Sequence, residues 1–515
     1  MEASIPILWI SVILPLLVAL VGVKVKDENI DSIAYTLAAT LLLPVIVVII
    51  AAFKGLLGEG LVDPWMAHIG SVGTFALTLD GLSSLVIAGV SLVTAFVSIY
   101  SIPYMKTRVT EMKEAGETPP SLGVYFFLYS LFSVAMLGLV YATNMVLFYI
   151  FLELTLLPSF LLIAYYGYGD RKRIAILYLV WTHIGAVMFL SGVLYYGFHV
   201  GNFDYLDVNT MTPITGTANM LGTAAKYVAL LMVLGLFVKM AVFGFHMWLP
   251  YAHAEAPTPI SALLSPNLIG LAGYALARIT VPIFPTFFAQ YKWILIYLAF
   301  TTIIYGGLVA LKQTDFKRFL AYSSISQMGY MLLGIATLTP IGITGAMIQY
   351  LSHALGKALL FMTAGVFITE LHGLRDIRLM GGLARKYPLT AALALLGFMH
   401  LVGMPPTIGM WSELFIVFGL FKDVALTTEF IPIVMLVIVA LMVSASYSFV
   451  TMRRIFYNKP RSEKAEMKTE TPGALQYSML FIGVMGVVFF LWINPYYHGL
   501  LEVIHKTFLF AGIGG

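Results

Sequence analysis

Residues 227–248 read YVALLMVLGLFVKMAVFGFHMW, which places Lys239 inside an apolar run that is long enough to cross a bilayer. An ammonium at that depth costs about 2.5 kcal/mol or more, and such residues normally face a hydrated interior with a partner. Pro250, Pro257 and Pro259 follow, and proline interrupts the hydrogen-bond ladder of a helix. The stretch therefore predicts a membrane helix that is broken just beyond a buried charge.

The chain makes the same costly choice three more times. Glu153 lies in the apolar run 145–166, Lys357 lies in the run 341–368, and Glu413 follows the segment Gly403-Met-Pro-Pro406. Ionisable residues inside membrane segments commonly mark ion pathways and proton relays. Two acids and two bases on four separate spans indicate a charge relay within a membrane protein.

The composition is that of an all-α, polytopic membrane protein. Mean hydropathy is +0.92, hydrophobic residues make up 60% of the chain, and charged residues make up 10%, against roughly 25% in soluble domains. Apolar windows of bilayer-crossing length recur along the sequence. They predict about fourteen spans, at 5–23, 31–53, 82–104, 122–141, 144–166, 174–198, 226–249, 258–281, 291–311, 318–338, 341–368, 389–421, 430–452 and 473–494.

The basic residues orient these spans. Of the 29 Lys and Arg residues, 21 fall in odd-numbered loops, and Lys317 is counted among them. Because loops rich in Lys and Arg stay in the cytoplasm, we expect both termini to be extracytoplasmic in a prokaryotic cell membrane. The stretch Trp65–Ser83 is expected to be an outer loop with strand pairing, and Asn494–Phe510 to lie along the outer interface.

Several functions are disfavoured by what the sequence lacks. With no cysteine, the chain has no disulfide, no thiolate-bound zinc and no cysteine-held iron–sulfur cluster of its own. It contains no glycine-rich phosphate loop and no nucleophile elbow. The small net charge of +4 reflects the distribution of basic residues among the loops, and it gives no sign of a nucleic-acid-binding surface. We therefore expect no metal site, no cofactor and no catalytic centre within this chain.

Two broken-helix patterns suggest an internal repeat. One lies in span seven, at His246-Met-Trp-Leu-Pro250, and the other lies in span twelve, at Gly403–Pro406. Transporters often carry interrupted helices at matching places in inverted halves. We expect peripheral helices in 1–121, a five-helix half-channel unit (spans four to eight) in 122–282, an inverted second unit (spans nine to thirteen) in 283–458, and a terminal helix with an interfacial tail in 459–515.

Two polar stripes are expected to face each other. Gln349, His353 and Lys357 recur every four residues and so share one face of span eleven. Span ten carries a second stripe, made of Ser323, Ser326, Gln327 and Tyr330. Such stripes can line a file of water, or they can bond neighbouring helices together, as Ser, Gln and Tyr often do in membranes.

Glu153 and Lys239 have the chemistry of a switch. A carboxylate and an ammonium brought close keep each other charged, and separating them favours release of a proton from the lysine. The alternative is a static ion pair that fixes helix packing. His246 and His400 are further candidates for the path, whereas Arg278 is expected to extend from the outer end of span eight towards the interface.

Taken together, these motifs make the sequence recognisable. It resembles the antiporter-like subunits shared by respiratory complex I, Mrp-type cation/proton antiporters and energy-converting membrane-bound hydrogenases. The matching segments are Phe151-Leu-Glu153 with Pro158, Phe237-Val-Lys239, 246–258 (HMWLPYAHAEAPT, which contains His253), 315–326 (DFKRFLAYSSIS), 352–361 (SHALGKALLF), and Gly403–Pro406 with Glu413.

The resemblance implies roles for particular residues. Glu153 and Lys239 would form the first half-channel, and His353 and Lys357 would link it to Glu413. Two departures stand out. Many relatives carry a lysine in the middle of span eight, where this chain has Asn267, Gly270 and Gly273, and Gln327 occupies a position that is often histidine.

The function predicted is translocation of protons, with Na⁺/H⁺ exchange left open, by one non-redox subunit of a larger complex. Its partners would be H⁺ or Na⁺, the lipid bilayer and neighbouring membrane subunits of that complex. A secondary path would use His246, His253, Ser326, Gln327, Gln349 and His400. The alternatives are a stand-alone solute transporter and a structural membrane anchor with vestigial charges.

Overall fold

The computed structural model describes residues 5–425 and 427–510, and most of them are helical. The helices up to residue 283 are α1 (Ile7–Gly22), α2 (Ile30–Leu41), α3 (Leu43–Phe53), α4 (Gly81–Glu114), α5 (Leu122–Tyr141), α6 (Met145–Tyr166), α7 (Arg171–Val200), α8 (Ala225–Met240), α9 (Trp248–Glu255), α10 (Thr258–Leu263), α11 (Ile269–Ala275) and α12 (Val281–Ile283). The later helices are α13 (Pro285–Lys312), α14 (Phe316–Ala336), α15 (Pro340–Glu370), α16 (Leu383–Lys386), α17 (Pro388–Val402), α18 (Gly409–Val424), α19 (Phe430–Met452), α20 (Ala474–Leu491) and α21 (Asn494–Phe510).

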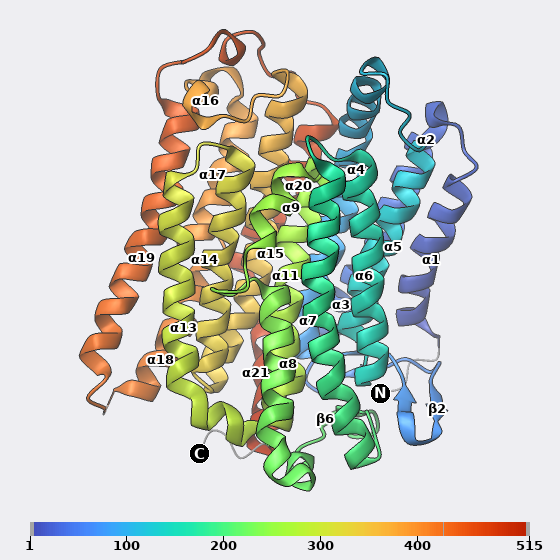
Figure 1. Cartoon of the computed structure of the whole chain (residues 1–515), viewed down its shortest axis with the longest axis vertical. Coiled ribbons are helices and arrows are strands. Elements are labelled where there is room, and N and C mark those ends of the chain that lie inside the picture. Colours follow the sequence, from blue (N-terminus) through green and yellow to red (C-terminus); the bar gives the residue numbers. More distant parts are fainter. Residues whose placement is uncertain (1–4, 426, 511–515) are drawn as a thin grey trace.

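The long helices run side by side along the long axis of the molecule (Figure 1). Within the described residues, eleven helical segments are long and apolar enough to cross a membrane. The prediction of an all-α, polytopic membrane protein is confirmed at this level. Of the fourteen predicted spans, α1 and α17 are shorter apolar helices, and α14 is not among the eleven. Polar residues of the second stripe lower the hydropathy of α14.

The loops between spans supply the caps that start many of these helices. The Asn144 side chain accepts the backbone N–H of Val146 at 2.9 Å at the start of α6. Asp315 accepts the N–H of Arg318 at 2.9 Å at the start of α14. Because the first N–H groups of a helix have no partner within the helix, such caps fix where each span begins.

Short strand pairs form in the loops between spans, and the sequence predicts those within Trp65–Ser83. Antiparallel pairs join β1 (Leu61–Val62) to β4 (Thr78–Leu79) and β2 (Ala67–Ile69) to β3 (Gly73–Phe75). A third pair, β5 (Leu206–Asp207) with β6 (Thr212–Pro213), lies between α7 and α8. Lys506 of α21 donates to the Gly58 carbonyl at 3.0 Å, which fastens this helix to the same set of loops.

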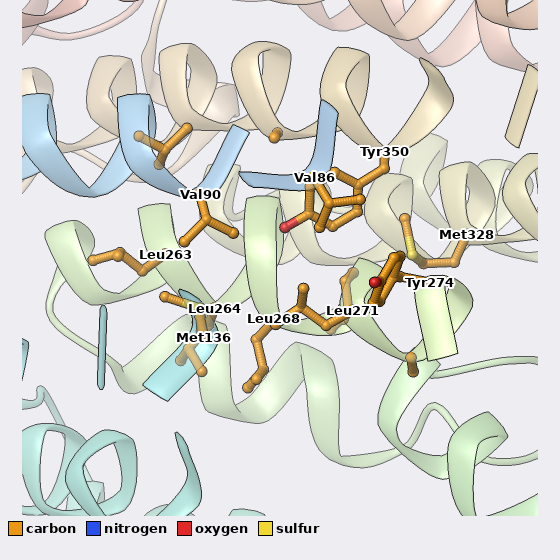
Figure 2. Close-up of a cluster of buried hydrophobic side chains, with 14 of the residues drawn as sticks. Val86, Val90, Met136, Leu263, Leu264, Leu268, Leu271, Tyr274, Met328 and Tyr350 are labelled. Atoms are coloured by element: carbon orange, nitrogen blue, oxygen red, sulfur yellow. The ribbon is translucent and has the colours of Figure 1, made fainter. Parts of the chain in front are cut away.

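The centre of the bundle is built around α4, α10, α11 and α15. The candidate spans formed by Thr258–Ile283 and Pro340–Glu370 are buried throughout. Figure 2 shows side chains from α4, α5, α10, α11, α14 and α15 converging in one apolar cluster. The Tyr350 ring packs against both Gly89 and Gly270. A Cβ added at Gly89 would stand 3.1 Å from a ring carbon of Tyr350, and a Cβ added at Gly270 would stand 2.6 Å from one. These two glycines therefore allow three helices to approach closely.

Arg278 does not extend to the interface, and that expectation is wrong. Its side chain is 2% exposed, and its Nη2 lies 2.7 Å from Oδ2 of Asp80, which is equally buried. Asp80 also caps α4 by accepting the N–H of Ser83 at 2.9 Å. One carboxylate thus joins the start of α4 to the end of span eight, and packing against α4 leaves Arg278 no route to the surface.

Replacing Arg278 with methionine should lower the melting temperature of the purified chain strongly. Removing one partner of a buried ion pair costs roughly 3–5 kcal/mol because the remaining charge stays buried without compensation. The matched control is Lys106→Met, since Lys106 pairs with Asp31 at 2.6 Å while the two side chains are 39% and 43% exposed. We expect little change there, and equal melting temperatures for both variants would contradict the structural role of Arg278.

Candidate functional site

The chain leaves helical conformation directly after Lys239. Helix α8 ends at Met240, Ala241 has a positive φ of 56°, and the next helix begins at Trp248. The Trp248 indole N–H donates to the Val238 carbonyl at 2.9 Å, across the interruption. Carbonyls at a helix end lack partners within the helix, and water is scarce in a bilayer core. The indole therefore stabilises the break.

Neighbouring helices hold the interrupted segment as well. The Trp181 indole on α7 donates to the Phe245 carbonyl at 3.1 Å, and the Phe243 N–H donates to the Thr302 hydroxyl of α13 at 3.2 Å. Figure 1 shows α9 above α8. The interruption is consequently an ordered feature of the bundle that is fastened on both sides.

Lys239 is 3% exposed, and its Nζ has no hydrogen-bond partner in the described protein. The charge of Glu153 acts on this lysine, yet the described side chains of the two residues are not within ion-pair distance. Glu153 and Lys239 thus interact electrostatically without forming an ion pair. An ammonium in this setting is free to take water or a second group as its partner.

Glu153 lies on the flank of α6. It accepts a hydrogen bond from the Tyr149 hydroxyl at 3.3 Å, and its second oxygen lies 3.4 Å from Nδ1 of His183. A cavity of about 400 Å³ between α6 and α7 is lined by both Glu153 and His183. Sequence reasoning missed His183, although an ionisable residue inside the apolar span 174–198 was the signal that could have found it.

Three histidine or amide side chains continue inward from the first interruption. His246, His253 and Asn267 are buried, and none of their side-chain nitrogen or oxygen atoms has a hydrogen-bond partner in the described protein. The charges of Lys317 and Lys357 act on His253. Asn267 lies in the wide turn Leu264–Leu268, which has π-helical geometry. Buried polar groups nearly always have a partner, so these three side chains are exceptions to a general rule.

The predicted polar face of α15 turns towards α14. Lys357 Nζ donates to the Ser323 hydroxyl at 2.5 Å and to the Leu320 carbonyl at 2.9 Å. Gln349 Nε2 donates to Oε1 of Gln327 at 2.5 Å. His353, between them, has no partner for either ring nitrogen in the described protein. Four-residue spacing therefore places these groups on one face, as the sequence predicts.

Other members of the second stripe bond helices together. The Ser326 hydroxyl donates to the Ile303 carbonyl of α13 at 2.9 Å, and the Tyr330 hydroxyl pairs with Ser444 of α19 at 3.0 Å. His400 pairs through Nδ1 with the Ser352 hydroxyl at 3.0 Å. For these residues the geometry matches interhelical bonding.

The second interruption separates α17 from α18. Helix α17 ends at Val402, Gly403 has a φ of 66°, and α18 begins at Gly409. Glu413 is 7% exposed, and its carboxylate folds back over Gly403. A Cβ at position 403 would stand 2.4 Å from its Oε2. The carboxylate thus lies at the break itself.

Lys317 is a buried cation that the loop assignment missed. It is fully buried at the start of α14, and its Nζ donates to the carbonyls of Ala254 (3.5 Å) and Ala256. These carbonyls end α9, where a positive charge complements the helix dipole. Its place two residues after the cap Asp315 suggested a loop, but α9 packs over it.

No group of three or more His, Asp or Glu side chains that could hold a metal ion occurs within residues 5–425 and 427–510.

A polytopic helical bundle with acids and bases at two interruptions defines a membrane protein of the antiporter-like class. A family model described as NADH:quinone oxidoreductase/Mrp antiporter, TM, matches residues 142–441, and the chain belongs to this family. The resemblance found in the sequence is thereby confirmed.

Individual relatives agree with this assignment. The chain is 30% identical to NADH-quinone oxidoreductase subunit M of Rickettsia prowazekii, over 76% of this chain and 75% of that protein. It is 31% identical to F(420)H(2) dehydrogenase subunit M of Methanosarcina mazei, over 79% and 80%. The fold is similar to a chain in the Mrp complex from Dietzia sp. DQ12-45-1b, with a TM-score of 0.79, 21% identity and 97% coverage of both chains.

Replacing Gly403 with alanine should destabilise the chain more than Gly201→Ala. Both glycines have positive φ, 66° and 78°, where alanine costs about 1–2 kcal/mol. Only position 403 adds a collision with Glu413, because a Cβ at Gly201 meets nothing within 4 Å. Melting temperatures of the purified variants measure the difference. The difference should vanish in a Glu413→Ala background, and its persistence there would show that the carboxylate is not the obstacle.

Proposed function

We propose that the chain is a proton-translocating, antiporter-like subunit, in which protons move along buried polar side chains between Glu153 and Glu413. One observation carries the proposal. Buried polar atoms without a protein partner recur from α8 to α18, and they include atoms of Lys239, His246, His253, Asn267, His353 and Glu413. Such groups bind ordered water when the protein offers no partner. Linked by water, they make a polar row through an apolar bundle, and all of its members except Asn267 can titrate.

The first half of the path starts at the flank of α6. A proton that arrives at Glu153 neutralises the carboxylate whose charge acts on Lys239, and a proton that arrives at His183 places a compensating positive charge beside that carboxylate. Loss of that attraction favours release of the lysine proton. His246, within the interruption, and His253, in α9 beyond it, are the next groups that can accept it. The side chains supply positions for the proton, and the interruption supplies room for water.

The second half of the path runs along α15 to α18. His353 stands one turn before Lys357, whose proton is held by Ser323 and the Leu320 carbonyl. Glu413, at the second interruption, is the last ionisable group of the row. These are the roles that the family resemblance implies for His353, Lys357 and Glu413.

The proposal includes fourteen spans, in which α8 with α9, and α17 with α18, each form one interrupted span. The segments 122–282 and 283–458 are then inverted five-helix units, flanked by 1–121 and 459–515. Figure 1 supports an even number of crossings, because α1 begins and α21 ends at the end of the bundle opposite α16. Arg385 and Lys386 belong to α16, so that end is assigned to the cytoplasm and both termini to the outside.

The subunit is proposed to act beside other membrane subunits. Relatives are named as subunits of NADH-quinone oxidoreductase and of F(420)H(2) dehydrogenase. The chain has no cysteine, and its described residues contain no metal-binding cluster. In this proposal, redox-active or ion-exchanging neighbouring subunits supply the driving force for proton translocation. A variant of this function is Na⁺/H⁺ exchange, in which Na⁺ crosses the membrane in the direction opposite to the proton.

A structural anchor with vestigial charges is the second candidate, and one observation favours it. The span-eight positions where many relatives carry lysine hold Gly270 and Gly273, and the side chains of Tyr350 and Met331 fill the space beside them. An ionisable bridge from span eight is thus replaced by packing and by the Asn267 amide.

Replacing Lys239 with alanine should abolish coupled proton translocation and leave the complex assembled. The measurement is acidification of inverted membrane vesicles, together with the yield of intact complex. The matched control is Lys226→Ala, at the exposed start of the same helix, which should translocate normally. Undiminished pumping by the Lys239 variant would refute the relay and favour the anchor.

Single cysteines test the proposed topology, since the chain has none of its own. Asn209 and Arg461 are exposed in loops at opposite ends of the bundle. In intact cells, a membrane-impermeant maleimide should label Asn209→Cys, and it should reach Arg461→Cys only after permeabilisation. The opposite pattern would place both termini in the cytoplasm.

A further inference from the structure

Four buried side chains and carbonyls form a hydrogen-bonded chain across the second interruption. Ser412 donates its hydroxyl to Oε1 of Gln349 at 2.6 Å, and Gln349 Nε2 donates to Oε1 of Gln327 at 2.5 Å. Gln327 Nε2 then donates to the Leu401 carbonyl at 3.0 Å. All four residues are fully buried. Because Leu401 lies in the last turn of α17 and Ser412 lies in the first turn of α18, the chain connects the two halves of the interrupted segment through α14 and α15.

The last link of the chain meets a need that the interruption creates. Carbonyls in the last turn of α17 have no N–H partner within the helix, and an unpaired buried carbonyl is costly. The Gln327 amide satisfies the Leu401 carbonyl. Its second N–H donates to the Tyr447 hydroxyl at 2.8 Å, so this amide is fully engaged on its donor side.

The chain also surrounds the candidate carboxylate. Glu413 directly follows Ser412, and its carboxylate rests on Gly403, two residues beyond Leu401. Glu413 is thus placed by its neighbour Ser412, at one end of the hydrogen-bonded chain, and by Gly403, which lies close to Leu401 at the other end. Any change in the spacing of α17 and α18 that moves the carboxylate must also stretch this chain.

The first interruption is fastened differently. There the Trp248 indole donates directly to the Val238 carbonyl, and the ammonium of Lys239 has no partner in the described protein. At the second interruption two amides intervene, and they belong to helices outside the broken segment. Amides do not titrate near neutral pH, so the link keeps the same hydrogen-bond direction whatever the protonation of its neighbours.

We propose that Gln327 and Gln349 are positioning residues that clamp α17 to α18 at a fixed spacing and thereby hold Glu413 over Gly403. The second interruption then works as a rigid unit that rearranges only when the amide clamp opens. The consequence for transport rests on the proposed function, whereas the clamp itself does not.

Spin-label distances test the clamp independently of transport. The chain has no cysteine, and Ala392 on α17 and Phe418 on α18 are exposed, so cysteine can be introduced at both sites for labelling. Pulsed electron paramagnetic resonance on the full chain in lipid nanodiscs should give one narrow distance distribution. Gln349→Leu and Gln327→Leu should each broaden or shift it. The double variant should add nothing further, because both changes cut the same chain.

Tyr447→Phe is the matched control. It removes the other acceptor of Gln327 Nε2 and leaves the chain from Ser412 to Leu401 intact, so the distribution should stay narrow. Ser412→Ala should broaden it, and Ser412→Thr, which restores a hydroxyl, should narrow it again. These smaller changes serve if a leucine variant fails to fold. Unchanged distances in Ser412→Ala and in a folded leucine variant would overturn the clamp.

Transport by the assembled complex gives the second readout. Cutting the clamp should reduce proton translocation about tenfold, the factor that corresponds to one lost buried hydrogen bond of ordinary strength. A change in distances without a change in transport would uphold the clamp and contradict the role of Glu413. Unchanged distances with reduced transport would overturn the clamp and leave the proposed function standing.

Discussion

A polypeptide in a bilayer must satisfy its own backbone hydrogen bonds, and the arrangement of this bundle follows from that constraint. Two of its segments leave helical conformation inside the bundle, and the carbonyls at those helix ends need partners from outside their own helix. Trp248 serves the Val238 carbonyl at the first interruption, and Gln327 serves the Leu401 carbonyl at the second. Because these carbonyls are hydrogen-bonded, the interrupted helices stay folded even though an ammonium or a carboxylate lies beside each break.

The same constraint explains which parts of the molecule could be predicted from sequence. Hydropathy locates most spans, because each must present apolar side chains over the bilayer thickness. Four-residue spacing places Gln349 and Lys357 on one face, because helix geometry is local, and both side chains do reach α14. Glycine locates the end of α17, since Gly403 directly follows Val402 with a positive φ. Proline does not locate the end of α8, because α8 ends at Met240 and Pro250 lies within α9.

Contacts between distant segments were not predictable in this way. His183 meets Glu153 only because α7 packs on α6, and Lys317 is buried only because α9 ends above it. Arg278 illustrates the cost of local reasoning. Counted along its own span, the residue lies near the membrane surface, but Asp80 at the start of α4 binds it inside the protein. Hydropathy and periodicity describe one helix at a time, so they carry no information about such neighbours.

The centre of the bundle combines apolar packing with a few polar side chains. Tyr350 fits between Gly89 and Gly270, so packing fills the space in which many relatives place an ionisable side chain of span eight. The polar groups that remain there, Asn267 and His353, have no partner in the described protein. Under the proposed function they are joined by water, and transfer through this region depends on hydration more than on fixed charges.

The interruptions on either side of that region differ in freedom. Lys239 stands at the first without a fixed partner, while the amides of Gln327 and Gln349 hold the second across two helices. A change of charge meets least resistance where the ionisable group is least fastened. Under the proposed mechanism, the first interruption is consequently where a change at Glu153 enters the bundle, and the second is where it must do work against packed structure before an ion can leave.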